Sequence, residues 1–167
     1  MDHDAILARK AAAGDTAAFT ILVRGHEGAV RRFLGRLSRQ QGSDDLAQET
    51  FLRAWRRASD YRGEGTYRGW LMRIAWTVFL DTRRAAGRRE EREAAIPAHD
   101  VAHDPNQSLD LQRALALLGT RERAAALLCF GEGCSHGEAA EIMGLPLGTL
   151  KSILARARAA LVERLEN

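Results

Sequence analysis

Apolar residues recur along this chain with the spacing of α-helices in two stretches, one before residue 88 and one after residue 107. The pattern is clearest between residues 15 and 37, where one expected helical face carries Phe19, Leu22, Val23, Val30, Phe33, Leu34 and Leu37. The chain has three prolines and few β-branched runs. The sequence therefore predicts an all-α protein.

Capping residues and short polar breaks set the first expected helices. Residues 4–13 form a short helix, and Asp15 is placed as the N-cap of the long helix that follows, because its carboxylate can accept from free backbone N–H groups. A Gly-Ser pair at 42–43 ends the long helix. Ser43 or Asp44 then caps a third helix.

A polar loop separates the third helix from a fourth. The third runs to about Ser59, and residues 60–66 contain polar residues and glycines. Thr66 begins the fourth helix, which ends near Gly87. Together these helices make one domain, residues 1–87.

The next segment has the composition of a linker. Residues 88–106 combine mixed charge with two prolines and lack an apolar period, which is typical of a flexible connection. Apolar periodicity returns from Ser108. We therefore expect two small helical domains joined by a flexible linker, the second being three or four helices within residues 107–167.

The second domain ends in the layout of a helix-turn-helix. Ser135 and Glu138 have the spacing of a capping box, in which each side chain bonds the other's backbone N–H. Gly144-Leu145-Pro146 then breaks the helix and makes a turn.

A longer helix is expected from about Leu147, and its two faces differ in character. Its apolar face carries Leu150, Leu154, Ala157, Leu161 and Leu165. Its other face carries Lys151, Ser152, Ala155 and Arg156. A recognition helix needs small residues for close approach and cations for phosphates and base edges. An ordinary amphipathic helix pair with a solvated charged face fits this stretch as well.

The charge of the chain is unevenly distributed. Residues 1–92 carry 18 cationic and 12 acidic side chains, whereas residues 93–167 carry 7 and 10. The excess lies in residues 53–92, which hold 11 arginines and 5 acids. A chain that contacts nucleic acid is expected to place charge in this way, and a solvated helix face can do the same.

Cysteine and histidine give little sign of metal or redox chemistry. Cys129 and Cys134 are expected to be reduced, partly buried thiols. His99 and His103, with Cys134 and His136 later, lack the paired spacing of a metal site. The sequence also lacks a nucleotide-binding loop, a nucleophile constellation and a paired-carboxylate cleft. We therefore expect no cofactor, no metal and no enzymatic activity of its own.

Four segments carry distinctive sequences in a fixed order. They are residues 14–36, 44–55, 61–75 and 148–152, the last followed by Arg156-Ala157-Arg158. The second reads Asp-Asp-Leu-Ala-Gln-Glu-Thr-Phe-Leu-Arg-Ala-Trp and the fourth Gly-Thr-Leu-Lys-Ser. In this order and spacing they resemble the extracytoplasmic-function (ECF) sigma factors of bacterial RNA polymerase. The resemblance covers nearly the whole chain.

The resemblance implies a function and a set of partners. The first domain would bind the polymerase clamp and the −10 promoter element, and the second the −35 element and the polymerase flap. Residues 88–106 would pass through the polymerase cleft. Core RNA polymerase, promoter DNA and an anti-sigma factor are the implied partners. The chain shows no signal peptide or apolar run of transmembrane length, so we expect it in the cytoplasm, without membrane insertion.

Three groups of residues are assigned to these surfaces. Helical spacing places Asp45, Gln48, Glu49 and Arg56 on one face, which suits a basic protein better than phosphate, and the resemblance assigns it to the clamp. The resemblance assigns −10 recognition to Tyr61, Arg62, Gly63, Tyr67, Arg73, Thr77 and Arg84. It assigns −35 recognition to Thr149, Lys151, Ser152, Ala155, Arg156 and Arg158.

The chain departs from the family pattern at both DNA-binding surfaces. Trp76-Thr77 stands where the family usually carries a polar residue and asparagine, and Trp76 is expected to point away from the core. Ile153 replaces a commonly basic position and Ala155 a bulkier one. We therefore expect an unusual −10 preference and a −35 readout that depends partly on DNA shape.

Two other functions fit parts of the sequence. A helix-turn-helix regulator that works without polymerase would bind palindromic sites and leaves residues 44–84 unexplained. A sigma mimic that titrates an anti-sigma factor would not need Lys151 and Arg156.

Overall fold

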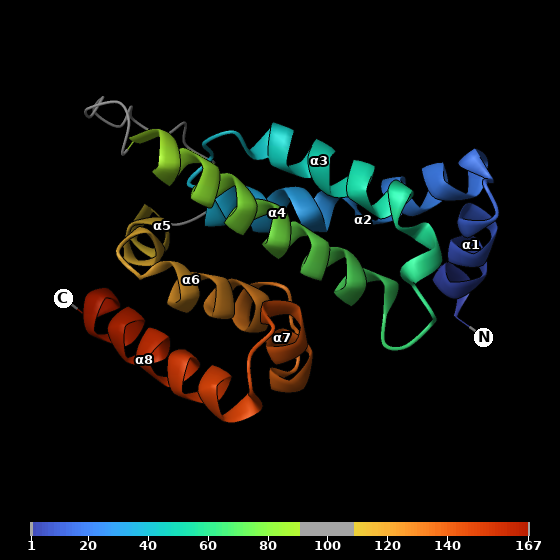
Figure 1. Ribbon diagram of the computed structural model, residues 1–167. Helices are drawn as coiled ribbons and strands as arrows, with labels where there is room; N and C mark the ends of the chain where they lie inside the picture. Colours follow the sequence, from blue (N-terminus) through green and yellow to red (C-terminus); the bar gives the residue numbers. More distant parts are fainter. Residues whose placement is uncertain (1, 91–108, 167) are drawn as a thin grey trace. The chain divides into compact units, whose positions relative to one another are not determined.

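The computed structural model describes residues 2–90 and 109–166, which are helical with short connections (Figure 1). The expected all-α class is confirmed. Packing divides these residues into two compact units, 2–34 with 42–90 and 35–41 with 109–166. Most of the expected linker lies outside the described residues. None of the described helices combines the length and apolar content needed to span a bilayer.

The first unit is built from four α-helices and one short 3₁₀ turn. They are α1 (His3–Ala12), α2 (Thr16–Leu37), α3 (Ser43–Arg56), η1 (Ala58–Asp60) and α4 (Tyr67–Glu90). α3 packs along α4, and α1 packs against η1 and α4. The fully buried side chains in this unit include Leu22, Val30, Phe33, Leu34, Thr50, Leu71, Met72 and Val78. This packing fixes the angular position of α3 and α4, and therefore which of their side chains face solvent.

The expected cap at Asp15 is present, and the helix expected to begin at Thr66 is capped by that residue. The Asp15 carboxylate accepts a hydrogen bond from the Ala18 N–H at 3.0 Å. The Thr66 hydroxyl accepts from the Gly69 N–H at 3.0 Å, at the start of α4. Local side-chain chemistry therefore sets both helix starts.

The expected cap of α3 is wrong. Gly42 precedes the helix with a φ of +62°, in the left-handed region that glycine enters without strain, and Ser43 is the first helical residue. The Asp44 carboxylate instead accepts from Arg31 of α2, at 2.5 Å. The helix also ends at Arg56 rather than near Ser59, because the next residues tighten into η1.

The second unit is a cluster of short helices packed on one longer helix. They are α5 (Leu109–Ala116), α6 (Thr120–Ala126), the π-helical turn η2 (Leu127–Gly131), α7 (His136–Met143) and α8 (Leu147–Leu165). α8 packs on α5, α6 and α7. One core cluster contains Ala114, Leu118, Ala126, Ala157 and Leu161. Leu165 was expected on this apolar face, but it is 51% exposed because it is the last residue of the helix.

The helix-turn-helix is formed as expected. The Ser135 N–H donates to Glu138 Oε2 at 2.7 Å, and the Glu138 N–H donates to Ser135 Oγ at 3.1 Å, which completes the capping box. Gly144 ends α7 with a φ of +64°, the left-handed conformation common after a helix. Pro146 immediately precedes α8.

A buried arginine, which the sequence did not reveal, fixes the start of this unit. Arg123 lies on α6 and is 5% exposed. Its guanidinium donates to the carbonyl oxygens of Leu115, Ala116 and Leu118 at 2.9, 3.2 and 2.8 Å. These carbonyls lie at the end of α5, where backbone acceptors lack helical partners. Arg123 therefore joins α5 to α6.

Candidate nucleic-acid interface and docking face

α3 presents the mixed acidic and amide face that its sequence predicted. Asp45, Gln48 and Arg56 are exposed and Glu49 is half-buried. The opposite side of the helix, with Leu46, Ala47, Thr50 and Ala54, is buried. Thr50, although polar, is satisfied there because its hydroxyl donates to the Leu46 carbonyl at 2.8 Å.

An exposed leucine lies within this face and was missed at the sequence level. Leu52 is 43% exposed and follows Gln48 by one helical turn. Single exposed leucines are ordinary on protein surfaces. Here the apolar side chain lies among acids, an amide and an arginine, the mixture typical of a protein–protein interface. We call the set Asp45, Gln48, Glu49, Leu52 and Arg56 the α3 face.

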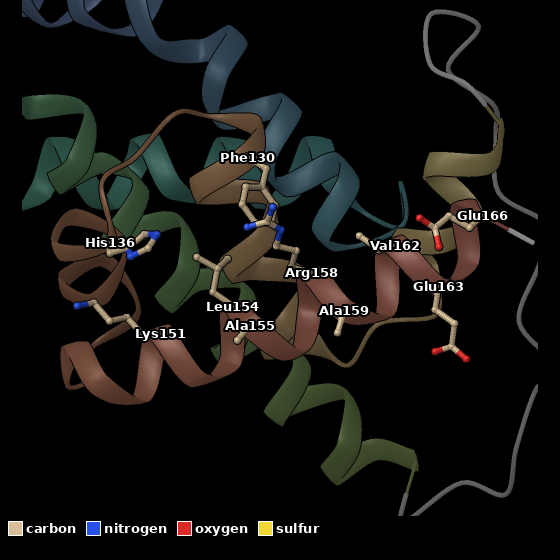
Figure 2. Close-up of a pocket in the computed structure, with 10 residues that line it drawn as sticks. All are labelled: Phe130, His136, Lys151, Leu154, Ala155, Arg158, Ala159, Val162, Glu163 and Glu166. Atoms are coloured by element: carbon tan, nitrogen blue, oxygen red, sulfur yellow. The ribbon is translucent and has the colours of Figure 1, made fainter.

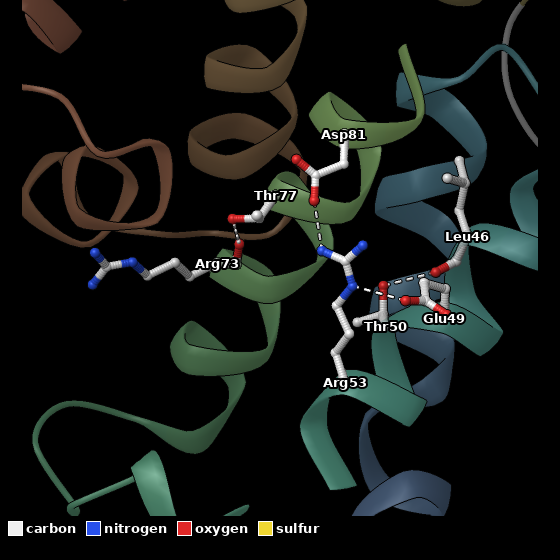
Figure 3. A network of polar contacts seen from close by, with 7 residues as sticks. All are labelled: Leu46, Glu49, Thr50, Arg53, Arg73, Thr77 and Asp81. Atoms are coloured by element: carbon white, nitrogen blue, oxygen red, sulfur yellow. Dashed lines mark hydrogen bonds and ion pairs between the residues drawn. The ribbon is translucent and has the colours of Figure 1, made fainter. Parts of the chain in front are cut away.

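One arginine connects the α3 face to α4 (Figure 3). Arg53 Nε donates to Glu49 Oε1 at 2.8 Å, and its Nη1 donates to Asp81 Oδ2 at 2.7 Å. The hydrogen bond to Asp81 and then that to Glu49 raise the pKa of the Arg53 guanidinium. The charged form of Arg53 is therefore held between two carboxylates on two helices.

The aromatic residues at the start of α4 form a packed cluster. The rings of Tyr61, Tyr67 and Trp70 lie 5.2 to 5.7 Å apart, and His26 of α2 lies 5.6 Å from Tyr67. Tyr67 is 3% exposed, and burial raises the pKa of its phenol well above the ordinary value. The resemblance assigned Tyr67 to −10 recognition, but neighbouring rings and helices cover its ring in this structure. Trp70 is half-buried in the same cluster.

The loop before α4 presents backbone, one cation and one acid, Glu64, to solvent. Gly63 and Gly65 adopt φ values of +79° and +70°, which favour glycine. The Tyr61 hydroxyl donates to the Gly65 carbonyl at 3.1 Å and closes the loop. Arg62 is exposed and Tyr61 is half-buried. The loop can thus bring backbone groups and a guanidinium close to a ligand.

The expected polar stripe on α4 is exposed. Arg73, Thr77 and Arg84 face solvent, and we call them the α4 face. The Thr77 hydroxyl donates to the Arg73 carbonyl at 3.0 Å, so its single donor is used within the helix and its lone pairs remain as acceptors. Thr77 is therefore restricted to accepting hydrogen bonds from a ligand while this bond lasts.

Trp76 does not point away from the core as expected. It is 5% exposed, and its ring stacks on Phe79 at 5.9 Å with an interplanar angle of 21°. Met72, Trp76 and Phe79 follow one another by about one helical turn and widen the buried side of α4. Trp76 is therefore a packing residue in this structure, and its ring is not available to stack on a base.

The solvent side of α8 carries the residues assigned to −35 recognition. Thr149, Lys151, Ser152, Ala155, Arg156 and Arg158 are all exposed. We call the first five the α8 face. Arg156 Nε lies 3.9 Å from Glu122 Oε1, which is too long for a hydrogen bond. The Arg156 side chain is 67% exposed. Ile153 is 3% exposed. It packs in the core, where a basic side chain would lack solvent.

A groove with an apolar lining runs beside the α8 face (Figure 2). Phe130 and Val162 are 55% and 46% exposed there, next to Leu154. Lys151 and Ala155 of the α8 face also line the groove, together with Arg158, Glu163 and Glu166. Exposed apolar side chains next to cations suit a protein segment better than a bare phosphate backbone. This groove could not be predicted from the sequence, because Phe130 and Val162 come from different helices.

The cysteines and histidines form no obvious reactive centre in the described part of the chain. Cys129 and Cys134 are half-buried and are not joined in a disulfide, and burial raises the pKa of Cys129. Among residues 2–90 and 109–166, His, Cys, Asp and Glu side chains do not assemble a group of three that could hold a metal ion. His99 and His103 lie outside these residues.

Both units match known protein families. Residues 22–89 match the family described as Sigma-70 region 2, and residues 108–161 match the family described as Sigma-70, region 4. The chain is 40% identical to the ECF RNA polymerase sigma factor SigE of Mycolicibacterium smegmatis, over 88% of this chain and 62% of that protein. It therefore spans less than two thirds of that relative. It is 34% identical to ECF RNA polymerase sigma factor SigC of Mycobacterium tuberculosis, over 96% of this chain and 91% of SigC.

Two solved structures are similar along most of the chain. The sigma factor RpoE from Bartonella quintana, in complex with the anti-sigma factor NepR, has a TM-score of 0.80 at 29% identity and covers 89% of this chain and 96% of its own. CnrH, in complex with the cytosolic domain of CnrY, has a TM-score of 0.71 at 30% identity and covers 99% and 98%.

Proposed function

The chain belongs to the ECF sigma factors of RNA polymerase, which are transcription initiation factors, and on this premise we propose that it directs core polymerase to a set of promoters. It would bind the −35 element as duplex and the −10 element as single strand. One observation carries the proposal. The same chain presents an acidic and apolar face on α3 and a cationic recognition face on α8, which suit two different kinds of partner.

We propose that the α3 face binds the polymerase clamp. Asp45 and Glu49 would repel phosphate, and they can pair with a basic protein surface. Leu52 adds apolar area at the middle of this face. A desolvated leucine surrounded by complementary charges is the usual composition of an interface that contributes affinity and orientation together.

We propose that the loop before α4 and the α4 face bind the melted −10 strand. Arg62, Arg73 and Arg84 are exposed and can contact the backbone. The left-handed glycines Gly63 and Gly65 allow close approach, so a base that has left the stack can be held against the loop. Tyr67 and Trp70 would act indirectly, by supporting the loop from beneath.

We propose that the α8 face reads the −35 element in the major groove. Lys151, Ser152 and Arg156 can reach base edges, and Arg158 is placed further along α8, where a phosphate contact is expected. The small side chain of Ala155 allows the helix to approach closely. Few specific contacts remain, which leaves room for readout through DNA shape.

We further infer that the groove beside the α8 face takes a protein segment. The polymerase flap is the proposed occupant, because Phe130 and Val162 offer apolar area next to the DNA-binding cations. Of the two solved structures named above, the sigma factor RpoE is bound to the anti-sigma factor NepR, and CnrH is bound to the cytosolic domain of CnrY. An anti-sigma factor is accordingly proposed as a further partner of this chain.

We also propose how the chain is divided into working parts and where the protein acts. Residues 1–87 and 107–167 would be the two working domains, and 88–106 the linker that enters the polymerase cleft. The protein would act in the cytoplasm, where polymerase is found, and supply specificity without catalysing a reaction itself.

In vitro transcription tests this function directly. Core polymerase with the full chain should produce new start sites on genomic fragments, each preceded by shared −35 and −10 elements. The Lys151→Ala/Arg156→Ala variant should lose most of these transcripts and retain core binding. A simple operator-binding regulator would protect DNA without polymerase and give no new start sites, which would refute the proposal.

A further inference from the structure

We propose that Arg53 is a positioning residue that couples the α3 face to α4. Asp81 on α4 holds Arg53 in place, and it thereby affects the affinity of the α3 face for core polymerase. The inference rests on the proposed function, because it assumes that the α3 face binds polymerase. It assigns a role to Arg53 and Asp81, which belong to neither the α3 face nor the α4 face.

The geometry shows one guanidinium shared by two carboxylates (Figure 3). Arg53 contacts Glu49 through Nε and Asp81 through Nη1, at 2.8 and 2.7 Å. Glu49 lies one turn earlier on the same helix, whereas Asp81 lies on the neighbouring helix. The planar guanidinium holds its donors at fixed angles, so the position of one carboxylate constrains the other.

The exposure of these groups indicates positioning rather than stability. The side chains of Arg53, Glu49 and Asp81 are 30%, 38% and 42% exposed. Ion pairs this accessible to water contribute little to folding. The two ion pairs can still hold the Arg53 side chain in one conformation. Its rotation is restricted when Glu49 and Asp81 both bind the guanidinium.

The consequence for Glu49 follows from charge and geometry. Because Asp81 pairs with Arg53, the Arg53 charge is shared between Asp81 and Glu49. The shared guanidinium also holds the Glu49 carboxylate at the edge of the α3 face. Without Asp81, the guanidinium would have Glu49 as its nearest acid and would neutralise it more completely. Glu49 would then attract a basic partner less strongly. A change on α4 should therefore weaken binding at α3.

A double-mutant cycle on the full chain tests the coupling. Asp81→Asn should lower affinity for core polymerase about three- to tenfold, as expected for side chains that interact within one network. If Asp81 acts through Glu49, the Glu49→Gln/Asp81→Asn variant should bind no more weakly than Glu49→Gln alone. Fluorescence titration of labelled protein with core enzyme measures all four affinities.

A matched control is available in the same unit. Arg57 and Asp60 form an exposed pair of the same type at 2.8 Å, within one segment rather than between α3 and α4. Asp60→Asn should leave core affinity unchanged. Asp81→Glu, which keeps the charge, should recover most of the affinity lost in Asp81→Asn. Thermal unfolding of each variant separates a change in binding from a loss of fold.

The results distinguish failure of the Arg53 coupling from failure of the proposed polymerase docking by the α3 face. Wild-type core affinity in Asp81→Asn, or independent losses that add in the double variant, would overturn the coupling. The second outcome would instead make Asp81 a direct contact. If reversing the charges of the α3 face itself leaves core binding intact, the docking proposal fails, and the role of Arg53 fails with it.

Discussion

At the scale of single residues, aromatic side chains near the −10 surface act through packing. Tyr67 and Trp76 are 3% and 5% exposed, and each contacts another ring. A buried tyrosine or tryptophan contributes mainly through the apolar area it removes from water. At the proposed −10 surface, base-specific contacts would therefore be made by the loop backbone, by arginines and by Thr77.

The burial of Tyr67 predicts a pH-dependent stability. Burial, with a smaller contribution from the Asp4 carboxylate, raises the pKa of its phenol, so folding favours the protonated form. This contribution is complete below the ordinary phenol pKa of about 10 and is lost as the pH rises above it. The free energy of unfolding should therefore fall at alkaline pH, and less steeply in Tyr67→Phe.

Urea unfolding at about pH 8 and about pH 11 measures this difference, because the two values lie on either side of the ordinary phenol pKa. Tyr61→Phe is the matched comparison, since Tyr61 is only half-buried. The same alkaline loss in Tyr67→Phe as in the wild type would show that another group is responsible.

Arg156 offers a residue-scale test of base reading against phosphate binding. A bidentate base contact should be worth about 1–3 kcal/mol and be lost for one base pair. A phosphate contact would weaken all sequences alike and lower the salt slope by about one unit. We expect Arg156→Ala to show both effects and Arg158→Ala to show the phosphate effect only.

Binding of holoenzyme to single-base −35 variants at two salt concentrations separates these effects. Lys151→Ala/Arg156→Ala should abolish −35 discrimination. Full promoter activity in that double variant would mean that α8 does not read the −35 element.

At the scale of elements, α3 and the loop before α4 present surfaces of different chemistry. The exposed side of α3 combines acids, an amide and Leu52 with Arg56, whereas the loop combines two glycines with Arg62 and Glu64. The first suits a basic protein and the second a phosphate backbone with an extruded base. Substitutions in α3 should therefore affect polymerase binding, and substitutions in the loop should affect −10 preference.

The α3 face should contribute much of the affinity for core polymerase. Reversing the charges of Asp45 and Glu49 together with Gln48→Ala should cost about 2 kcal/mol or more if the face is desolvated on binding. Leu52→Ala should also weaken binding measurably. A titration with core enzyme measures both, and Leu117→Ala, at a leucine that is 63% exposed in the second unit, is the control. Unchanged affinity would eliminate this face as the docking site.

The loop should set −10 preference. Exchanging residues 62–65 for those of another ECF sigma factor should shift −10 preference and leave −35 preference unchanged. Tyr61 and Tyr67 are kept, because they support the loop and Tyr67 is buried. A promoter library read by sequencing gives the preference of each variant. Identical −10 preferences would show that the loop does not read bases.

At the scale of the whole molecule, the proposed −10 and −35 surfaces lie on two separate units of one chain. When one surface is bound, the other is held at a high local concentration, so neither contact needs to be strong alone. The free energies of the two contacts then contribute jointly to promoter binding. This arrangement predicts that strengthening one contact compensates for weakening the other.

A premelted promoter tests this compensation. Lys151→Ala/Arg156→Ala should strongly reduce transcription from a duplex promoter. The loss should be smaller on a template whose −10 element is already unpaired, because the cost of melting no longer opposes binding by the first unit. Transcript yields on matched duplex and bubble templates measure the difference. Equal losses on both templates would contradict the joint contribution.

Features that depend on nearby residues were available from the sequence. The helical class, the Asp15 cap, the helix start near Thr66, the Ser135–Glu138 capping box and the exposed side of α8 all follow from interactions within about one turn. The resemblance identified the family on the same kind of local sequence pattern. Such features are local, because hydrogen bonds to free N–H groups and apolar periodicity need no knowledge of neighbouring helices.

Tertiary packing decided the features that depend on which side of a helix its neighbours cover. It buried Trp76 and Ile153, left Leu52 exposed and placed Asp81 beside Arg53. Arg53 and Asp81 are far apart in the sequence, and no periodic pattern relates them. Their pairing arises only when α3 packs along α4 and the two carboxylates meet one guanidinium. The chain's local chemistry thus sets which helices form, and the contacts between those helices set which side chains can bind.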